Sequence, residues 1–467
     1  MTLYYNKTVT DIVQLDNGGL RLILDDDHSF DVDCAVLTLG HSQDRLDKVE
    51  IEYNEFVKSN QSRNPHLQYF RCYPLSQLQT IPKEATVAIQ GMGLACHDIL
   101  CELTHGRGGR FVQYVGERQL TYVPTGEEPA RIYIYSRSLL PFSARGRNQK
   151  GVGGQYHARF FTRSLIDQLR GKSRAQLDFD KQLLPIIIHE MCFVYDCTLN
   201  NSWDLPFDNY EPDEKTRQII RRLFYPLENV EFSSFELFAL WIIRFLERDL
   251  DEAYKGNVSS AVKAATDVLR DIRDIVRYAV DFRGLIPESH QLFLTDLCPV
   301  FNRMAVGPPA EKNEELLALL RNGLVEFASA SYPRVRTDTT SATFVISSKN
   351  REVHADVLVR GMIEKFIPQR DESPLIENML RRGLIRSFTN GNFHPSGIDI
   401  NGQQNPITNK DTSIPNMWAL GNVCEGPNWY TYVLPRPSVN SRAIHDAAKC
   451  AFNIFDYLTN RNKSILQ

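Results

Sequence analysis

The stretch from residue 85 to residue 103 limits the possible folds of this chain more than any other. It opens with a short apolar run, residues 85–90, whose β-branched side chains are typical of a buried parallel strand. A glycine turn, Gly91-Met92-Gly93, follows, and residues 94–103 then carry apolar side chains at helical spacing. A strand that enters a helix through Gly-x-Gly can bind a pyrophosphate, because the glycines allow close approach and the helix N-terminus offers free N–H groups. The segment therefore predicts a Rossmann-like α/β unit with a dinucleotide site.

Four residues of this turn are the predicted dinucleotide contacts: Gly91, Gly93, Leu94 and Cys96. Cys96 stands where such turns usually have a third glycine, and its small side chain still permits close packing of the helix on the strand. A tight strand–helix turn without a ligand is the alternative that the motif leaves open.

Composition narrows the class of protein. A chain of 467 residues exceeds one ordinary core, so we expect two or three domains. A net charge of −4 without long runs of one sign argues against a nucleic-acid or anionic-membrane surface, and no apolar run reaches the length of a membrane span. The N-terminus does not resemble a signal peptide. Nine scattered cysteines without a Cys-x-x-Cys pair predict a reduced, cytoplasmic protein with no disulfide framework and no metal site.

The first part of the chain has the pattern of a β-meander. Strands are predicted over 8–15, 20–24 and 30–32, with a hairpin turn at Asn17-Gly18-Gly19. A further apolar strand then ends at Gly40-His41. From the residues alone, this is a buried strand that ends in a glycine turn.

Two features beyond residue 103 bear on the dinucleotide. An apolar strand over 130–135 ends at Ser136 and Arg137. The second strand of a Rossmann unit ends near the adenosine ribose, where an acid favours NAD and Ser or Arg accommodates the extra phosphate of NADP, so NADP is favoured over NAD. The Gly- and Arg-rich loop 104–111 has two equally supported interpretations, a helix C-cap or a loop that binds an anion.

Residues 160–400 are mostly helical in pattern. Short β segments return at 344–346 and after residue 352. His189-Glu190 resembles the start of a zinc-protease motif, but Phe193 replaces the second histidine, so no catalytic residue is assigned. A charge run is expected to form a solvated helix face: Arg270, Asp271, Arg273 and Asp274. Helices are predicted over 161–169, 216–225, 234–254, 258–282, 314–330 and 356–366.

The C-terminal part begins with a strand over 417–422 that ends in Gly421-Asn422. Three later residues are the predicted substrate contacts: Asn428, Trp429 and Tyr430. Ordinary packing is the equally supported alternative for the two aromatic residues. A helix over 439–457, with Ser438 as its N-cap, completes the pattern.

Several motifs in the same order resemble one family, the FAD-NAD(P)-binding proteins distantly related to ornithine and lysine N-monooxygenases. Its members share a GxGLxxxD turn, a GRGG loop, a P-S/T-G-x-E-P segment and a strand that ends in SR. The corresponding segments here are residues 91–98, 106–109, 124–129 and 136–137. In related two-dinucleotide flavoproteins, one strand that ends in Thr-Gly and a late strand that ends in Gly-Asp lie near the flavin. The resemblance therefore implies FAD contacts at Gly40, His41, Gly421 and Asn422, with Asn422 replacing the usual acid.

The implied fold is α/β, a Rossmann-like two-dinucleotide-binding architecture with a large helical insertion. The family's first strand–glycine-loop–helix, which holds the ADP half of FAD, has no counterpart in this sequence. It could be encoded upstream in a longer gene, supplied by a partner chain or a homo-oligomer, or lost in a degenerate relative. The predicted domains are the remainder of an FAD domain over 1–45, an NAD(P) unit over 46–150, a helical substrate or cap region over 151–400, and a return to the FAD domain over 401–467.

The leading functional hypothesis is a flavin-dependent oxidoreductase in which NAD(P)H reduces FAD, with monooxygenation of a small molecule as the implied reaction. A non-catalytic or partner-dependent subunit that has lost FAD binding is the main alternative. An NAD(P)-binding sensor that uses only the glycine turn is the third.

Overall fold

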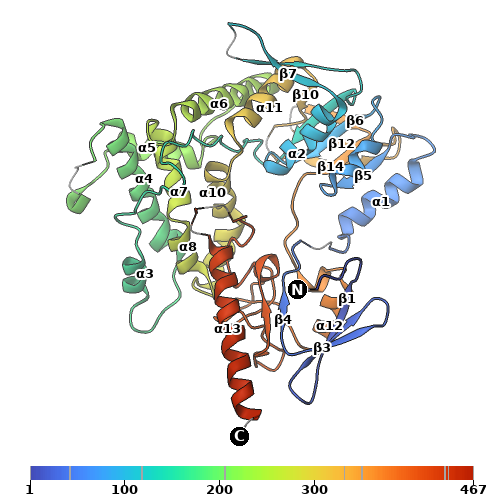
Figure 1. The fold of residues 1–467 in the computed structure, drawn as a ribbon. Helices are drawn as coiled ribbons and strands as arrows, with labels where there is room; N and C mark the ends of the chain where they lie inside the picture. The colour runs from blue at the N-terminus through green and yellow to red at the C-terminus, as the bar shows by residue number, and fades with distance from the viewer. Residues whose placement is uncertain are drawn as a thin grey trace.

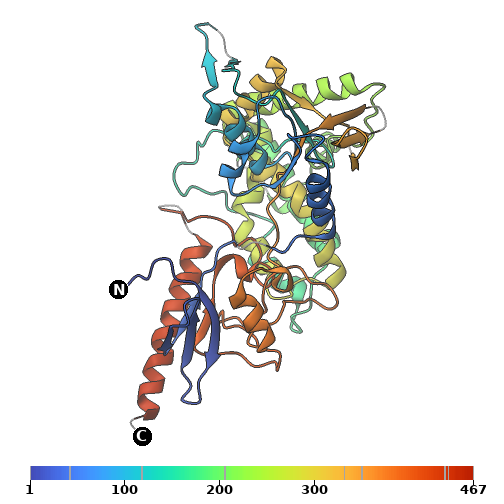
Figure 2. The ribbon, with the colours of Figure 1, turned by 90° about the vertical axis from the view of Figure 1, so that its right-hand side faces the viewer.

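The computed structural model arranges the chain in three parts (Figure 1). A parallel-sheet unit lies at one end, a helical region lies beside it, and a smaller unit that contains both termini lies at the other end (Figure 2). The structure describes residues 2–41, 44–116, 119–203, 207–330, 332–348, 351–435, 438–439 and 441–465. Within these ranges, no helix combines the length and the apolar character that crossing a membrane requires.

Five parallel strands form the central sheet, in the order β10-β9-β6-β14-β5. The middle strand is β6, which precedes the glycine turn and pairs with β9 and β14. Its residues Val87, Ala88 and Ile89 are fully buried, as expected for a parallel strand covered on both faces. The strands are β5 (Gln68–Arg71), β6 (Thr86–Gln90), β9 (Arg131–Tyr135), β10 (Val325–Phe327) and β14 (Val357–Arg360).

Each face of this sheet has its own cover. On one face, side chains of α2, α6 and α11 pack with Val87 and Ile89. On the other face, α1 and the antiparallel sheet β11-β12-β13 pack against Ala88, because successive strand residues point to opposite sides. A hairpin, β7-β8, extends from the edge of the unit (Figure 1). The elements are α1 (Lys48–Asn60), α2 (Leu94–Leu103), β7 (Arg110–Gln113), β8 (Leu120–Val123), α6 (Phe235–Lys255), α11 (Ala310–Asn322), β11 (Arg334–Asp338), β12 (Thr343–Ser348) and β13 (Arg351–Ala355).

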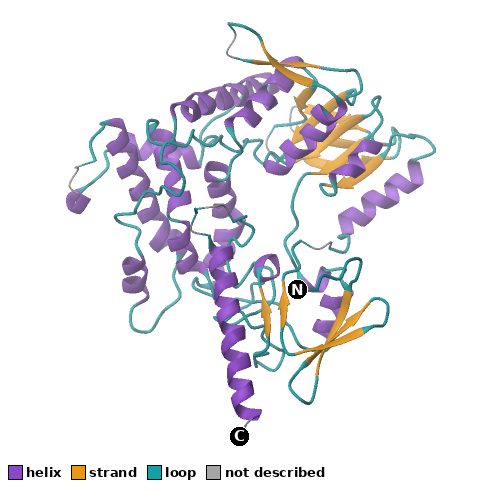
Figure 3. Ribbon diagram, viewed as in Figure 1, coloured by secondary structure: helices purple, strands orange, loops and turns teal. Residues whose placement is uncertain are grey.

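The helical region has a separate apolar core and lies apart from both groups of strands (Figure 3). Glu190 of α4 is fully buried and accepts hydrogen bonds from the backbone N–H groups of Phe160 and Phe161, both at 2.8 Å. Glu190 therefore anchors the segment that enters the helical region. This structural role explains why an acidic residue follows His189. The helices are α3 (Arg163–Arg170), α4 (Leu184–Leu199), α5 (Glu214–Phe224), α7 (Ala261–Asp271), α8 (Arg273–Val280), α9 (Pro287–Leu292) and α10 (Cys298–Ala305).

The terminal unit combines the two ends of the chain. An antiparallel sheet, β1-β2-β3, lies beside a parallel pair, β4 and β15. Helix α12 packs on β1, and the long helix α13 runs along the outside of the unit (Figure 2). The elements are β1 (Val9–Gln14), β2 (Leu20–Leu24), β3 (Ser29–Val32), β4 (Ala35–Leu37), α12 (Pro374–Arg381), β15 (Met417–Ala419) and α13 (Arg442–Ile465).

The predicted α/β class with a large helical insertion is confirmed, but four element predictions are wrong. The helix predicted over 356–366 is the strand β14, a short apolar run buried inside the sheet. The helix predicted over 314–330 ends at Asn322, where Gly323 adopts a left-handed φ of +82°, and β10 follows. The helix predicted over 258–282 is two helices that meet at Ile272. The last helix begins at Arg442, so Ser438 does not cap it.

The structure also groups two segments differently from the predicted domain ranges. Residues 151–400 do not form one helical region, because β10 and β14 pair into the central sheet. The terminal unit resumes well before residue 401, since Phe366 and Ile376 pack in the same core as Ile12. Pairing between strands that are distant in the chain sets these boundaries. The amino-acid composition shows no shift at these positions that would mark them in the sequence.

Candidate functional site

The glycine turn lies at the carboxyl end of β6, as predicted. Gly91 has a φ of +125°, and a Cβ atom there would lie 2.6 Å from the carbonyl oxygen of Gly361 at the end of β14. The Gly91 N–H donates to the Tyr135 carbonyl at 2.8 Å, which ties the turn to the end of β9. Only glycine fits this position, because both the backbone conformation and the close contact exclude a side chain.

Helix α2 begins at this turn with its first N–H groups free of side-chain caps. Gly93 is the N-cap, and no acidic residue occurs in the first turn. Leu94 is 40% exposed, whereas Cys96 is buried in the core between helix and sheet. The small Cys96 side chain thus allows the close packing expected of it. The free N–H groups and the dipole at the N-terminus of α2 would favour an anion there.

The ends of the two neighbouring strands complete this edge of the sheet. Ser136 follows β9 and accepts a hydrogen bond from the Leu139 N–H at 2.9 Å, and the side chain of Arg137 is exposed. Gly361 follows β14, and sequence reasoning missed it because a helix was predicted there. The run Val357–Arg360 followed by glycine was the available signal.

The second group of predicted cofactor residues also comes together. β4 and β15 pair in parallel, and the Leu420 N–H donates to the Leu37 carbonyl at 2.9 Å. Gly40-His41 and Gly421-Asn422 therefore follow adjacent strand ends at one edge. Both glycines have left-handed φ values, +69° and +79°, and face open space.

Two antiparallel linkers join the sheet unit to the terminal unit. Asp44 and Asp371 form an isolated bridge between them, and the Arg45 N–H donates to the Arg370 carbonyl at 2.6 Å. The carboxyl ends of β5 and β14 hold the start of α1, where the first linker ends, through ion pairs. These pairs are Arg71–Glu50 at 2.7 Å and Arg360–Asp47 at 3.0 Å. The linkers therefore place the carboxyl edge of the sheet toward the terminal unit.

We expect Asp44→Asn to stabilise the protein at neutral pH. Burial raises the pKa of the Asp44 carboxyl to about 6, and Arg370 lowers it only in part. A carboxyl group whose pKa is raised by folding destabilises the folded protein as pH rises from the unfolded pKa to the folded pKa. The stability gained in Asp44→Asn should therefore be absent below about pH 4 and reach about 1–2 kcal/mol near pH 7. Urea unfolding across this range measures it. A gain that is the same at every pH would contradict the assigned cause.

A cavity of about 410 Å³ lies where the helical region meets the start of α13. Its walls come from α7 and α8, the loop 145–155, residues 430–434, Val439 and residues 441–443. Lys150 fixes the loop by pairing with Asp267 at 2.5 Å and Asp271 at 2.6 Å. Five arginines line the cavity, against three aspartates: Arg145, Arg270, Arg273, Arg277 and Arg442. The charge run expected to be a solvated helix face is therefore a cavity wall.

Of the three predicted substrate contacts, only Tyr430 lines this cavity. Trp429 is buried with its ring centroid 5.2 Å from that of Phe293, which supports the packing interpretation. Asn428 is buried and accepts a hydrogen bond from Arg442 at 2.6 Å. Asn428 and Trp429 thus hold the segment that presents Tyr430, and their predicted substrate contact finds no support in this geometry.

Glu425 fixes the backbone at Tyr430. Its carboxylate accepts hydrogen bonds from the N–H groups of Tyr430 at 2.8 Å and Thr431 at 2.6 Å, and from the Thr431 hydroxyl at 2.6 Å. Tyr430 has a φ of +64°, an uncommon value for a bulky residue that these bonds maintain. Burial raises the pKa of Glu425, although the three donors oppose the shift.

The Gly- and Arg-rich loop after α2 has a structural role. Arg107 donates to the carbonyls of Leu78 at 3.1 Å, Ile81 at 2.7 Å and Glu127 at 2.9 Å. The loop follows the C-terminus of α2, at the opposite end of the helix from the glycine turn. Thr104, the C-cap of α2, donates its hydroxyl to the Leu100 carbonyl at 2.6 Å, so of the two interpretations of this loop the structure supports the helix cap.

Comparisons with known proteins agree with the motifs. The chain is 30% identical to an L-aspartate N-monooxygenase (nitrosuccinate-forming) of Streptomyces davaonensis, over 91% of this chain and 70% of that protein. It is also 30% identical to the enzyme of the same name from Streptomyces cremeus, over 79% of this chain and 60% of that protein. No family model matches the sequence.

Among solved structures, a cadaverine monooxygenase of desferrioxamine biosynthesis from Erwinia amylovora, bound to FAD, aligns with a TM-score of 0.42 and 9% identity. That alignment covers 97% of this chain and 69% of the other. The family resemblance drawn from the motifs is confirmed by the sequence relatives. The chain therefore belongs to the N-monooxygenase family that includes the nitrosuccinate-forming L-aspartate N-monooxygenases.

Proposed function

We propose that this chain is the catalytic chain of an N-monooxygenase that uses NADPH and FAD to oxidise the amino group of a small amino acid, with L-aspartate as the first candidate. The alignment of 91% of the chain with an L-aspartate N-monooxygenase carries the proposal. The glycine turn, the paired ends of β4 and β15 and the arginine-lined cavity support it. The chain spans 60% to 70% of the length of the relatives it matches, so the whole enzyme's activity is proposed here.

The residues around Gly91 fit the pyrophosphate of NADPH. The close approach of Gly91 to Gly361 leaves no room for a side chain at the turn between β6 and α2. The uncapped first turn of α2 offers backbone N–H groups to an anion. Arg137, exposed at the end of β9, would hold the 2′-phosphate.

Arg137→Ala should weaken NADPH binding by about 10- to 150-fold, because a charge-assisted phosphate contact contributes about 1.5–3 kcal/mol. NADH affinity should stay unchanged, since NADH lacks that phosphate. Calorimetric titration with both nucleotides measures the difference. Equal losses for the two nucleotides would rule out a 2′-phosphate contact.

The residues that follow β4 and β15 fit part of a flavin. Gly40 and Gly421 leave open space beside the two strand ends, and Asn422 offers an amide to a ribitol hydroxyl. Bound FAD would supply the redox and oxygen chemistry of the reaction. The chain's own residues would hold that cofactor and the substrate and keep them apart from solvent.

The direct test supplies the purified protein with FAD, NADPH, oxygen and L-aspartate. We expect L-aspartate to stimulate NADPH oxidation and to be converted to N-oxidised products that mass spectrometry detects. NADPH oxidation that does not respond to any amino acid, with no N-oxidised product, would contradict the proposal. It would favour a subunit that no longer catalyses the reaction.

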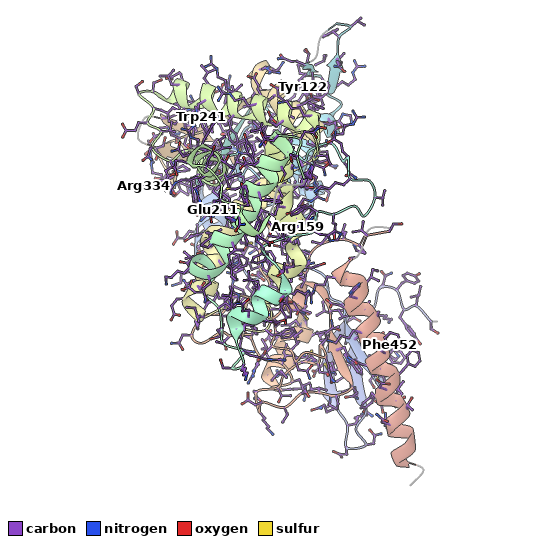
Figure 4. The ribbon with its side chains drawn as sticks, turned by 90° about the vertical axis from the view of Figure 1, so that its left-hand side faces the viewer. Tyr122, Arg159, Glu211, Trp241, Arg334 and Phe452 are labelled. Carbon is purple, nitrogen blue, oxygen red and sulfur yellow. The ribbon has the colours of Figure 1, made fainter. Side chains whose placement is uncertain are left out.

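We also propose that a further strand-bearing segment, from a partner chain, a second copy or the same gene, covers the outer face of the terminal unit. In the described chain, β4 pairs only with β15, and two strands alone form a marginal sheet. Large apolar side chains of β4, of the residues after it and of α13 are exposed: Val36, Leu39, Ile444, Phe452 and Phe455. Phe452 lies on α13, at the far end of the molecule from Tyr122 and Trp241 (Figure 4). Two results together would contradict this proposal. Light scattering would show that the chain is a monomer, and that monomer would bind FAD without any added chain.

The small-molecule substrate class follows from the same relatives. A cytoplasmic location is part of this proposal, and it rests on nine cysteines that are all free thiols, as expected in a reducing compartment.

A further inference from the structure

Most arginines of the cavity use their donors within the protein. Arg277 pairs with Asp274 at 2.7 Å and donates to the Tyr430 carbonyl at 2.7 Å. Arg442 pairs with Asp281 at 2.6 Å and donates to Asn428 at 2.6 Å. These two guanidinium groups hold the wall together and are not available to bind a ligand.

Arg273 differs from them. Its guanidinium carbon lies 4.5 Å from the centroid of the Tyr430 ring, which fixes the side chain by a cation–π contact. Within the residues that the structure describes, no carboxylate or carbonyl accepts a hydrogen bond from it. Burial lowers the pKa of Arg273, as expected for a cation that has lost water without gaining an acid. The N–H donors of this guanidinium are therefore available to a ligand in the cavity.

Arg270 offers a second cation on the same wall. It precedes Arg273 by three residues, so the two side chains lie on one side of the helical segment despite the break at Ile272. Its bond to Asp267 is long, at 3.3 Å, and Asp267 is shared with Lys150 at 2.5 Å. Arg270 therefore retains donors that Asp267 does not satisfy.

We propose that the cavity binds a dicarboxylic amino acid, with one carboxylate held in a bidentate contact by Arg273 and the other directed toward Arg270. The proposal rests on the proposed N-monooxygenase function and names its specificity-determining residue. A planar guanidinium with two free N–H edges matches a carboxylate, and it repels the second ammonium of a diamine or a basic amino acid. A phosphate has the same chemistry, so a cofactor phosphate is the competing source of the anion.

The test is calorimetric titration of the protein with L-aspartate, succinate, L-lysine and inorganic phosphate. Wild type should bind L-aspartate and succinate and should not bind L-lysine. Arg273→Gln should weaken both dicarboxylates by about 30-fold and Arg273→Lys by about tenfold, because lysine keeps the charge and loses the fork. Arg270→Gln, which leaves the Tyr430 stack intact, should weaken succinate by about fivefold. The matched control is Arg334→Gln, an exposed arginine on β11 (Figure 4), which should change nothing.

Several results would overturn the inference. These are succinate affinity that is unchanged in Arg273→Gln, wild type that binds L-lysine as tightly as succinate, or a loss confined to phosphate and NADPH. The last result would assign Arg273 to a cofactor phosphate.

The failure of this inference can be distinguished from the failure of the proposed function. NADPH oxidation stimulated by an amine without Arg273-dependent succinate binding would reject only the inference. Arg273-dependent succinate binding in a protein that takes up no flavin would reject only the proposed function.

Discussion

Gly93→Asp will weaken NADPH binding by at least about 100-fold while leaving the fold intact. The new carboxylate would stand at the N-terminus of α2, where the proposed pyrophosphate lies. Two like charges about 4 Å apart repel by about 4 kcal/mol at an effective dielectric constant of 20, more than enough for this loss. The fold should tolerate the change, because Gly93 has an extended backbone with φ of −94° and aspartate is a favourable N-cap. Its Cβ would lie 3.3 Å from the Phe142 ring, which must move slightly.

Two variants separate charge from crowding. Gly93→Asn has nearly the same shape without the charge, so its loss of NADPH affinity should be several times smaller. Gly402→Asp adds the same charge at an exposed position with open space around it, and it should have no effect. Calorimetric titration measures the affinities, and thermal unfolding checks the fold. NADPH affinity in Gly93→Asp equal to that of wild type would remove the nucleotide from this turn.

Arg442→Ala will lower the free energy of unfolding by about 3 kcal/mol, the lower end of the loss when one partner of a buried ion pair is removed, because this pair is mostly but not fully buried. Arg442 bonds to Asp281 at 2.6 Å and to Asn428 at 2.6 Å, and it joins the first turn of α13 to the helical region. Loss of the guanidinium would leave the Asp281 carboxylate in a mostly buried site, where the backbone N–H of Trp429 at 2.8 Å would be its remaining close donor. The loss should therefore be largest where Asp281 is ionised.

The pH dependence and a second arginine provide the controls. Burial raises the pKa of Asp281, and Arg442 opposes that shift, so the variant should raise it further. A raised folded pKa means that stability is lost as pH rises, so the defect should be larger near pH 8 than near pH 5. Arg461→Ala removes an exposed pair with Asp33 on the same helix and should cost less than about 1 kcal/mol. Urea unfolding monitored by tryptophan fluorescence compares them, and equal losses would contradict the role given to Arg442.

Local chemistry allowed part of this structure to be predicted from the sequence. The glycine turn after β6 and the hairpin at Gly18 depend on residues that are adjacent in the chain, so turn chemistry and periodicity identify them. The start of α6 at Ser234, which accepts a hydrogen bond from the Leu237 N–H, is another local signal. The parallel pairing of β4 and β15 required the family resemblance, because no local pattern joins the two ends of the chain.

The rest depends on contacts between distant segments. β14 was predicted as a helix because its short apolar run fits either structure, and burial inside the sheet decided the outcome. Gly361 was missed for the same reason. Arg273 was placed on a solvated face because a charge run usually is one, whereas here Tyr430 and the loop 145–155 enclose it. The double linker at Asp44 and Asp371 had no sequence signal.

The most direct test of the central claim is the flavin absorbance of the purified protein, supplied with FAD and then with NADPH in the absence of oxygen. We expect a bound flavin that NADPH bleaches, with bleaching slowed at least about 100-fold in Gly93→Asp at low NADPH concentration, in line with the lost affinity. A protein that retains no flavin, or a flavin that NADPH bleaches equally fast in wild type and in Gly93→Asp, would contradict it.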